Sequence, residues 1–277
     1  AKTVPHGGIV EALNAGLAIC RAPLVARMDA DDWSPPERLA RQASFLDAHP
    51  EVGVVGSRVL FGGDRVSQAG YAAYIDWING LVTPEAISLN RFIESPFAHP
   101  SVMFRRGLTA LWGSYRDGPF PEDYELWLRW LDAGVRMAKV DAELLRWDDR
   151  PGRLSRTDER YARRAFYACK ASYLSRWLAR HNAHHPGIIV WGAGRETRKR
   201  AEFLVEHGIG IEAYVDIDSR KIGQTIHGRP VLAEHQLPLP DQAFVVSYVG
   251  SRGARDDIRS RLGARGFREG VNFIVAA

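Results

Sequence analysis

Three aspartates lie within four positions near the start of the chain, at Asp29, Asp31 and Asp32. They follow the apolar run 23–26, which predicts a short buried strand, and open α/β sheets bind ligands at this end of their strands. Three carboxylates so close together repel one another. A hard cation such as Mg²⁺ or Mn²⁺ that also bridges to a diphosphate would neutralise them. A solvated acidic turn is the alternative, and it would be preferred for an isolated Asp-x-Asp.

The residues after the aspartates have the order of a helix start. Ser34 is the expected N-cap, two prolines follow it, and Glu37 lies three residues after the serine. The apolar residues of 39–48 then recur with a helical period, which predicts a helix that ends before Pro50.

Two later stretches carry further side chains that could do chemistry. His99 precedes the alternating run 101–104, which predicts a strand. Glu122 and Asp123 lie at the start of a helix predicted over 122–131, whose apolar residues share one face. Each has a plain alternative. The histidine could simply hydrogen-bond a loop, and an acid at a helix N-terminus could complement the dipole, which is worth about 0.3 to 1 kcal/mol.

Taken in order, these stretches between Gly7 and Ser155 resemble bacterial inverting family-two glycosyltransferases of the GT-A fold. The resemblance implies that Asp29 and Asp31 hold Mn²⁺ or Mg²⁺ on the diphosphate of a nucleotide-sugar donor, most simply a UDP-sugar. Asp123 would be the catalytic base in a single displacement with inversion. The acceptor, a saccharide or a lipid-linked saccharide, would be oriented by the residues His99 and Glu122. The donor would contact the residues Arg27, Asp29, Asp32, Arg150 and Arg153.

The first residues depart from this family. An N-terminal strand-helix-strand unit that holds the nucleotide base has no counterpart here, and 6–18 resembles the helix that normally follows it. We therefore expect a fragment that lacks roughly 60 to 90 residues, about one supersecondary unit or somewhat more. The usual histidine of the basic loop near Arg150 and Arg153 is also absent, and ordinary exposed arginines are the alternative there.

The composition of the 277 residues is that of a globular protein, with 45% hydrophobic and 25% charged residues. No apolar run reaches the roughly 18 residues that span a bilayer, and no secretory signal opens the chain, so the expected location is cytoplasmic. The two cysteines have no metal-ligand spacing. A net charge of +4 fits an anionic partner such as a nucleotide sugar or a membrane surface. No nucleic-acid partner is predicted.

The stretch 156–181 predicts a long helix in which arginines interleave with aromatic residues. Such a helix could lie on the inner membrane face as a peripheral contact. Packing of its aromatic side chains on a neighbouring domain is the favoured interpretation. We expect 1–155 to form the partial GT-A domain, 156–186 a helix and linker, and 187–277 a small Rossmann-like α/β domain.

The C-terminal region alternates strands and helices, with a Gly192-Ala193-Gly194 turn between the first strand and helix. Gly192, Gly194 and Asp216 are a candidate second nucleotide site, although Thr197 replaces the third glycine of the dinucleotide fingerprint. The region 187–277 resembles the nucleotide-sugar-binding domain of bacterial sugar acyltransferases. Two alternatives to the transferase remain open: a nicotinamide-dependent oxidoreductase or epimerase acting through this region, and a non-catalytic scaffold.

Overall fold

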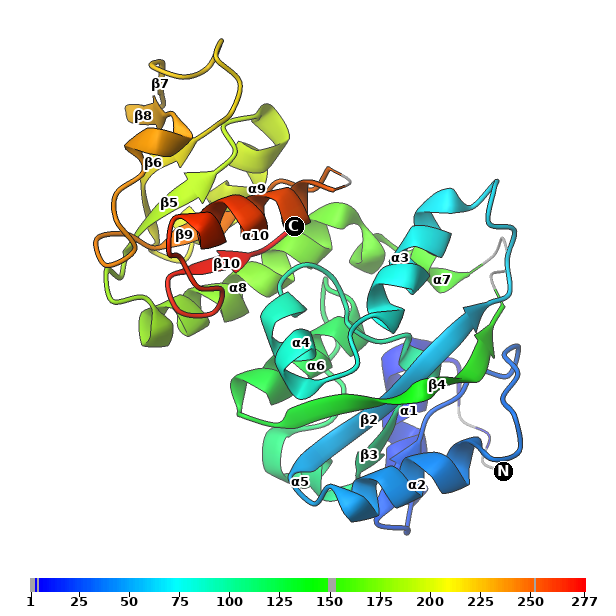
Figure 1. Cartoon of the computed structure of the whole chain (residues 1–277). Coiled ribbons are helices and arrows are strands. Elements are labelled where there is room, and N and C mark those ends of the chain that lie inside the picture. Colours follow the sequence, from blue (N-terminus) through cyan, green and yellow to red (C-terminus); the bar gives the residue numbers. More distant parts are fainter. Residues whose placement is uncertain (1–2, 4, 149–152, 252) are drawn as a thin grey trace. The chain divides into compact units, whose positions relative to one another are not determined.

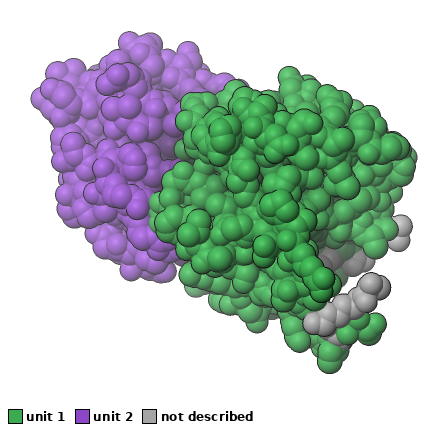
Figure 2. Space-filling model, turned by 90° about the horizontal axis from the view of Figure 1, so that it is seen from below, with its two compact units in different colours: residues 1–88, 95–166 green, residues 89–94, 167–277 purple. Residues whose placement is uncertain are grey.

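The computed structural model describes residues 3, 5–148, 153–251 and 253–277 (Figure 1). The chain divides into two compact units, coloured separately in Figure 2. Unit 1 comprises 1–88 and 95–166, and unit 2 comprises 89–94 and 167–277. Both are mixed α/β, and the first has the architecture expected of a GT-A type fold. The predicted division at 155 and 186 stays a prediction.

Unit 1 is built on a four-stranded sheet in the order β1-β3-β2-β4. Its strands are β1 (Leu24–Ala26), β2 (Val52–Phe61), β3 (Met103–Arg105) and β4 (Arg136–Trp147). Its helices are α1 (Gly8–Ile19), α2 (Arg38–Ala48), α3 (Ala69–Asn79), α4 (Pro84–Asn90, which ends in unit 2), α5 (Gly107–Trp112), α6 (Glu122–Asp132) and α7 (Leu154–Thr157), with 3₁₀ turns η1 (His99–Ser101) and η2 (Glu159–Tyr161).

The two faces of this sheet carry different cores because successive strand residues point to opposite sides. Val54 packs in a cluster with Trp127 and Trp130 of α6, whereas the next residue, Val55, packs with Leu46 of α2. Strand β3 runs antiparallel to both its neighbours, β1 and β2, while β2 and β4 run parallel. The carboxyl end of β1 therefore lies beside the start of β3, and this brings Arg27 next to the turn that contains His99.

The helix after the aspartates begins later than the sequence predicts. Helix α2 starts at Arg38, with Glu37 and not Ser34 at the N-cap position, and no side chain caps it. The second proline explains the difference, because Pro36 disfavours helical geometry in Pro35, which would be the first helical residue after a Ser34 cap. Trp33 is instead bonded to β4: its N–H donates to the Arg146 carbonyl at 3.2 Å, and the Arg146 N–H donates back at 2.7 Å.

The predicted helix over 156–181 is interrupted. Asp158 ends α7 and accepts a hydrogen bond from the Arg160 N–H at 2.9 Å, and the long helix α8 (Arg163–His181) begins only after η2. Tyr173 and Trp177 of α8 are buried in unit 2, where Trp177 contacts Phe92 and Phe244. Lys170 of the same helix is also buried. These contacts agree with the packing interpretation for this part of the helix.

Unit 2 contains a six-stranded sheet in the order β10-β9-β5-β6-β8-β7. Its strands are β5 (Gly187–Trp191), β6 (Gly210–Val215), β7 (Thr225–Ile226), β8 (Arg229–Leu232), β9 (Val245–Ser247) and β10 (Phe273–Val275), and its remaining helices are α9 (Arg195–Val205), η3 (Glu234–Gln236) and α10 (Ala254–Ala264). All pairs except β7 with β8 are parallel. Strand order reverses between β5 and β9, as in doubly wound α/β sheets.

The short segment 89–94 belongs to unit 2 through polar contacts. The Lys170 ammonium donates to the carbonyls of Ile93 at 3.0 Å and Ala276 at 2.8 Å. Arg259 on α10 donates to the Asn90 side chain at 2.9 Å. Across the described residues of both units, no helix is long and apolar enough to cross a bilayer.

Candidate active site

The aspartate cluster lies on a loop that is bonded to the end of β4. Asp32 accepts a hydrogen bond from the Asp148 N–H at 3.0 Å, and Asp32 N–H donates to the Asp29 carbonyl at 3.3 Å. Together with the Trp33–Arg146 bridge, these bonds fix the backbone that presents the carboxylates.

The pKa of Asp32 is raised, as expected for a buried carboxyl among other negative charges. Its pKa is raised to about 6, chiefly by burial and also by the charges of Asp29 and Asp31, although the hydrogen bond from the Asp148 N–H acts to lower it. Its Oδ2 atom is buried and has no hydrogen-bond partner among the described residues. A hard cation beside these carboxylates would remove both costs, so the donor set fits Mg²⁺ or Mn²⁺.

The protein alone does not complete a metal centre in the part of the chain that the structure describes, where no group of three or more His, Cys, Asp or Glu side chains is placed to hold an ion. A cation on Asp29 and Asp31 would therefore take its remaining ligands from water and from a diphosphate.

Arg27 connects the aspartate cluster to the other predicted residues. Its guanidinium pairs with Asp29 at 2.7 Å, and its Nη1 atom is buried without a hydrogen-bond partner among the described residues. Its backbone N–H donates to Val102 at 3.0 Å, beside the His99 turn. The Arg27 charge also lowers the pKa of His99 and of Asp123, as a smaller effect than burial in both cases. The three motifs therefore share one electrostatic environment.

Helix α2 supports this arrangement from the face of the sheet opposite α6. Arg38 donates to the Arg27 carbonyl at 2.7 Å and to the Gln42 side chain at 3.0 Å. Gln42 in turn donates to the carbonyls of Ser101 at 2.8 Å and Val55 at 3.2 Å. Both side chains are fully buried, and burial lowers the pKa of Arg38 to about 10. One arginine and one glutamine thus hold the aspartate loop and the His99 turn in register.

Asp123 is placed at the first turn of α6 with its pKa strongly raised. Burial and, to a smaller extent, the neighbouring Glu122 charge raise the pKa to about 7, although a 2.7 Å hydrogen bond from the Tyr124 N–H acts to lower it. Its side chain keeps partial exposure, unlike Glu122, which is 1% exposed. A partly exposed carboxyl with a pKa raised toward neutrality is suited to general-base chemistry.

His99 and Glu122, the two predicted acceptor residues near Asp123, are both buried. The His99 Nε2 atom lies 2.7 Å from the Tyr115 hydroxyl, and its Nδ1 atom lies 3.9 Å from Glu122 Oε1. Burial holds the pKa of His99 well below its usual value, so the ring is neutral. Glu122 Oε2 accepts a 2.6 Å hydrogen bond from the Tyr161 hydroxyl. These contacts fix both side chains. No contact here tests acceptor binding, which stays a prediction.

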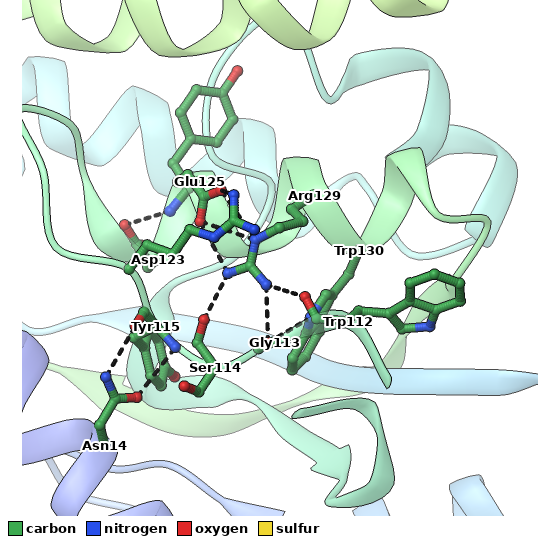
Figure 3. Close-up of polar contacts among 11 residues, drawn as sticks. Asn14, Trp112, Gly113, Ser114, Tyr115, Asp123, Glu125, Arg129 and Trp130 are labelled. Carbon is green, nitrogen blue, oxygen red and sulfur yellow. Dashed lines mark hydrogen bonds and ion pairs between the residues drawn. The ribbon is translucent and has the colours of Figure 1, made fainter. Parts of the chain in front are cut away.

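The loop that carries Tyr115, after α5, is held by hydrogen bonds from side chains of α6 (Figure 3). Arg129 donates to the carbonyls of Gly113 at 2.9 Å, Ser114 at 2.7 Å and Trp112, and to the Glu125 carboxylate on the turn before it. Asn14 of α1 exchanges two hydrogen bonds with the Tyr115 backbone, at 2.9 and 3.2 Å. The same helix therefore carries Asp123 and fixes the loop of the tyrosine that contacts His99.

Of the two predicted donor arginines, Arg150 lies outside the described residues. Arg153 lies over the Trp147 ring, 4.2 Å from its centre, and its charge lowers the pKa of Asp32 as a minor effect. The structure therefore places Arg153 within electrostatic range of the aspartates.

In unit 2, the Asp216 carboxylate of the candidate second nucleotide site is hydrogen-bonded by groups of the protein itself. Asp216 Oδ2 accepts from the Ala193 N–H at 2.8 Å and from the Lys221 ammonium at 3.1 Å, while Oδ1 accepts from the Asp218 N–H at 2.9 Å. Gly192 is required where it stands, with φ of 105° and the Thr197 and Val249 side chains against it, whereas Gly194 has open space. The carboxylate that a ribose would need thus ties the glycine turn to β6. Ligand binding here stays a prediction.

Tyr115, Tyr161, Arg38 and Gln42 were not among the predicted site residues. For Arg38 and Gln42 a signal existed, because they precede Leu46 at spacings of four, on the buried face of α2. The tyrosines are 16 and 39 residues from the side chains they contact, and nothing local marks them.

Residues 2–110 match the family model described as glycosyl transferase family 2. The chain is 34% identical over 143 residues to the amylovoran biosynthesis glycosyltransferase AmsE of Erwinia amylovora, covering 50% of each chain. It is 27% identical over 180 residues to the O-antigen biosynthesis glycosyltransferase WbnJ of Escherichia coli, covering 64% of this chain and 65% of that protein. The chain spans about half to two thirds of the length of these relatives.

A third relative, 32% identical over 138 residues, is the UDP-Gal:alpha-D-GlcNAc-diphosphoundecaprenol beta-1,3-galactosyltransferase of Escherichia coli, with 50% of this chain and 48% of that protein covered. Among solved structures, S. aureus TarS (residues 1–349) overlays with a TM-score of 0.44 at 18% identity, covering 72% of this chain and 50% of that chain.

Proposed function

We propose, from the match of residues 2–110 to the model of glycosyl transferase family 2, that this chain transfers a sugar from a nucleoside-diphosphate sugar to an acceptor hydroxyl with inversion. The donor is a UDP-sugar, and the acceptor is a saccharide or lipid-linked saccharide of a surface polysaccharide or glycoconjugate. The observation that carries the proposal is Arg27, which pairs with Asp29 while its charge acts on Asp123.

Asp29 and Asp31 hold the cation, Mn²⁺ or Mg²⁺, in this proposal. When bound, the cation supplies a Lewis acid that neutralises charge on the departing diphosphate. Arg27 has one buried nitrogen available for a donor oxygen among the described contacts, and Arg153 adds positive charge near Asp32. Both arginines support a diphosphate at this place.

Asp123 acts as the base. The acceptor O–H bond breaks as its oxygen attacks the anomeric carbon, the proton passes to the Asp123 carboxylate, and the sugar–phosphate bond opens on the opposite face. One base is enough for such a displacement. Burial and the Glu122 charge make Asp123 a stronger base than an ordinary aspartate, because they raise its pKa to about 7. His99 and Glu122 orient the acceptor in this proposal.

The donor half of the proposal is tested by calorimetric titration of UDP with and without Mn²⁺. We expect binding that requires Mn²⁺ in the parent chain, a loss of at least about tenfold in Asp31→Asn, and no loss in Asp47→Asn, an exposed control on α2. Equal binding without metal, or an unchanged Asp31→Asn variant, would remove the aspartates from donor binding.

A further inference from the structure

A row of four polar side chains from separate parts of unit 1 lies behind Asp123. Tyr115 of the loop before α6 contacts His99 of η1 at 2.7 Å. His99 faces Glu122 of α6 at 3.9 Å, and the other Glu122 oxygen accepts the Tyr161 hydroxyl of η2 at 2.6 Å. The resemblance assigned roles to His99 and Glu122 only, so the two tyrosines at the ends of the row are unexplained.

The turn that carries Tyr161 is held by contacts other than the bond to Glu122. Its turn is capped by Asp158, which accepts the Arg160 N–H at 2.9 Å and the Arg160 Nε–H at 3.2 Å. Arg160 also pairs with Asp117 at 3.3 Å, on the loop before α6. The hydroxyl is therefore aimed at Glu122 by a turn that other contacts hold in place.

The charge on Glu122 needs such a donor. The carboxylate is 1% exposed and cannot be hydrated, and the ring beside it is a neutral histidine. Burial, followed by the charge of Glu122, raises the pKa of Tyr161 far above its usual value, so this phenol remains a donor at every working pH. A hydroxyl donor to a buried carboxylate is a charge-assisted bond that favours the ionised form.

We infer that Tyr161 is a positioning residue of the base: its hydroxyl fixes the negative charge on Glu122 and so leaves Asp123 as the carboxyl that takes up the shared proton. Ionising two adjacent carboxyls in one buried environment is unfavourable, because their negative charges repel one another. The carboxyl that accepts the stronger hydrogen bond therefore keeps the negative charge. Arg27, Arg160, His99 and Tyr115 also face this pair, and His99 Nδ1 lies 3.9 Å from Glu122 Oε1. The catalytic meaning of this inference rests on the proposed function.

The test is a carbon-13 NMR titration of the Asp123 carboxyl, assigned by its loss in Asp123→Asn, in the parent chain and in Tyr161→Phe, Glu122→Gln and their double variant. The phenylalanine keeps the ring and removes only the hydroxyl. In the parent chain Asp123 should titrate with a pKa of about 7. Tyr161→Phe should lower that midpoint by about 1 pH unit, because the proton moves to Glu122.

Glu122→Gln should lower the same midpoint, since it removes the charge directly, and the double variant should equal Glu122→Gln alone. Tyr74→Phe is the matched control: its hydroxyl donates to the Ser95 carbonyl at 2.9 Å in the same unit, and its loss should leave the midpoint unchanged. An unchanged midpoint in Tyr161→Phe, or a further shift in the double variant, would overturn the inference.

This readout separates the inference from the proposed function, because it needs no turnover. Shifted titrations in a chain that transfers no sugar would leave the inference standing and refute the proposed function. In an active chain, the acid limb of the pH–rate profile should move to lower pH in Tyr161→Phe with a lower plateau. A merely structural loss would lower the plateau without moving the limb.

Discussion

At the scale of single residues, two adjacent carboxyls lie in different environments. Glu122 is buried and accepts a hydrogen bond from the Tyr161 hydroxyl, whereas Asp123 is partly exposed and accepts a hydrogen bond from the Tyr124 N–H. The sequence identified the pair, because two acids at a helix start in the order of the family are a local pattern. It did not identify the tyrosines, since their contacts are made only by the folded chain.

The raised pKa of Asp123 predicts how transfer depends on pH. A base works only when ionised, and burial together with the Glu122 charge raises this pKa to about 7. We therefore expect kcat/KM to rise with pH about tenfold per unit below pH 7 and to level off above it. Initial rates of UDP release from pH 5 to 9 measure this. An acid limb near pH 4, the value of an ordinary aspartate, would contradict the assigned environment.

At the scale of elements, α2 positions the site through its buried polar face. Strand β1, helix α2 and helix α6 were predictable because strand alternation, helical period and apolar faces are local signals. The start of α2 was not, because the serine and acid pattern of a cap outweighed the restriction that Pro36 imposes. The sequence pattern of an N-cap was present at Ser34, but the backbone does not become helical until Arg38.

Replacing Gln42 tests the role of this element. Gln42→Leu keeps the volume close to that of glutamine but leaves the Ser101 and Val55 carbonyls buried without their donor. Each such group costs about 1 to 3 kcal/mol, so we expect the free energy of unfolding to fall by about 2 to 6 kcal/mol. Urea denaturation measures it. Arg41→Ala, exposed on the same helix, should change it by less than about 0.5 kcal/mol, and equal effects would refute the special role of Gln42.

At the scale of the whole molecule, the two α/β units differ in how much of their structure and function could be predicted from the sequence. In unit 1 the motifs predicted the mixed α/β fold, whereas the roles of the candidate site residues stay predictions. In unit 2 the strand and glycine-turn pattern predicted the doubly wound sheet, but it also suggested a ribose contact at Asp216. The structure uses that carboxylate to join the Gly192 turn to β6 and Lys221. A short motif specifies the strand-turn-helix geometry more firmly than it specifies a ligand.

Asp216→Asn tests this structural use. Burial alone raises the pKa of Asp216, but the N–H groups of Asp218 and Ala193 and the Lys221 ammonium outweigh burial and hold it below its usual value. Its stabilising effect is thus full above the unfolded pKa and is lost as pH falls through the lower folded pKa.

The asparagine should lower the free energy of unfolding by about 1 to 3 kcal/mol at pH 7, and the difference should shrink below about pH 4. Calorimetry at both pH values measures it, with the exposed Asp241→Asn as control. An Asp216→Asn variant as stable as the parent chain at pH 7 would show that the carboxylate does not hold the turn.

The central claim is that Asp123 takes the acceptor proton during sugar transfer. The measurement is the rate of UDP release and product formation from UDP-sugars with Mn²⁺ and saccharide acceptors, compared between the parent chain, Asp123→Asn and Asp132→Asn at the other end of α6. The account predicts that Asp123→Asn loses about 10² to 10⁴ in kcat while still binding UDP, and that Asp132→Asn stays within about twofold. Full turnover by Asp123→Asn would contradict it.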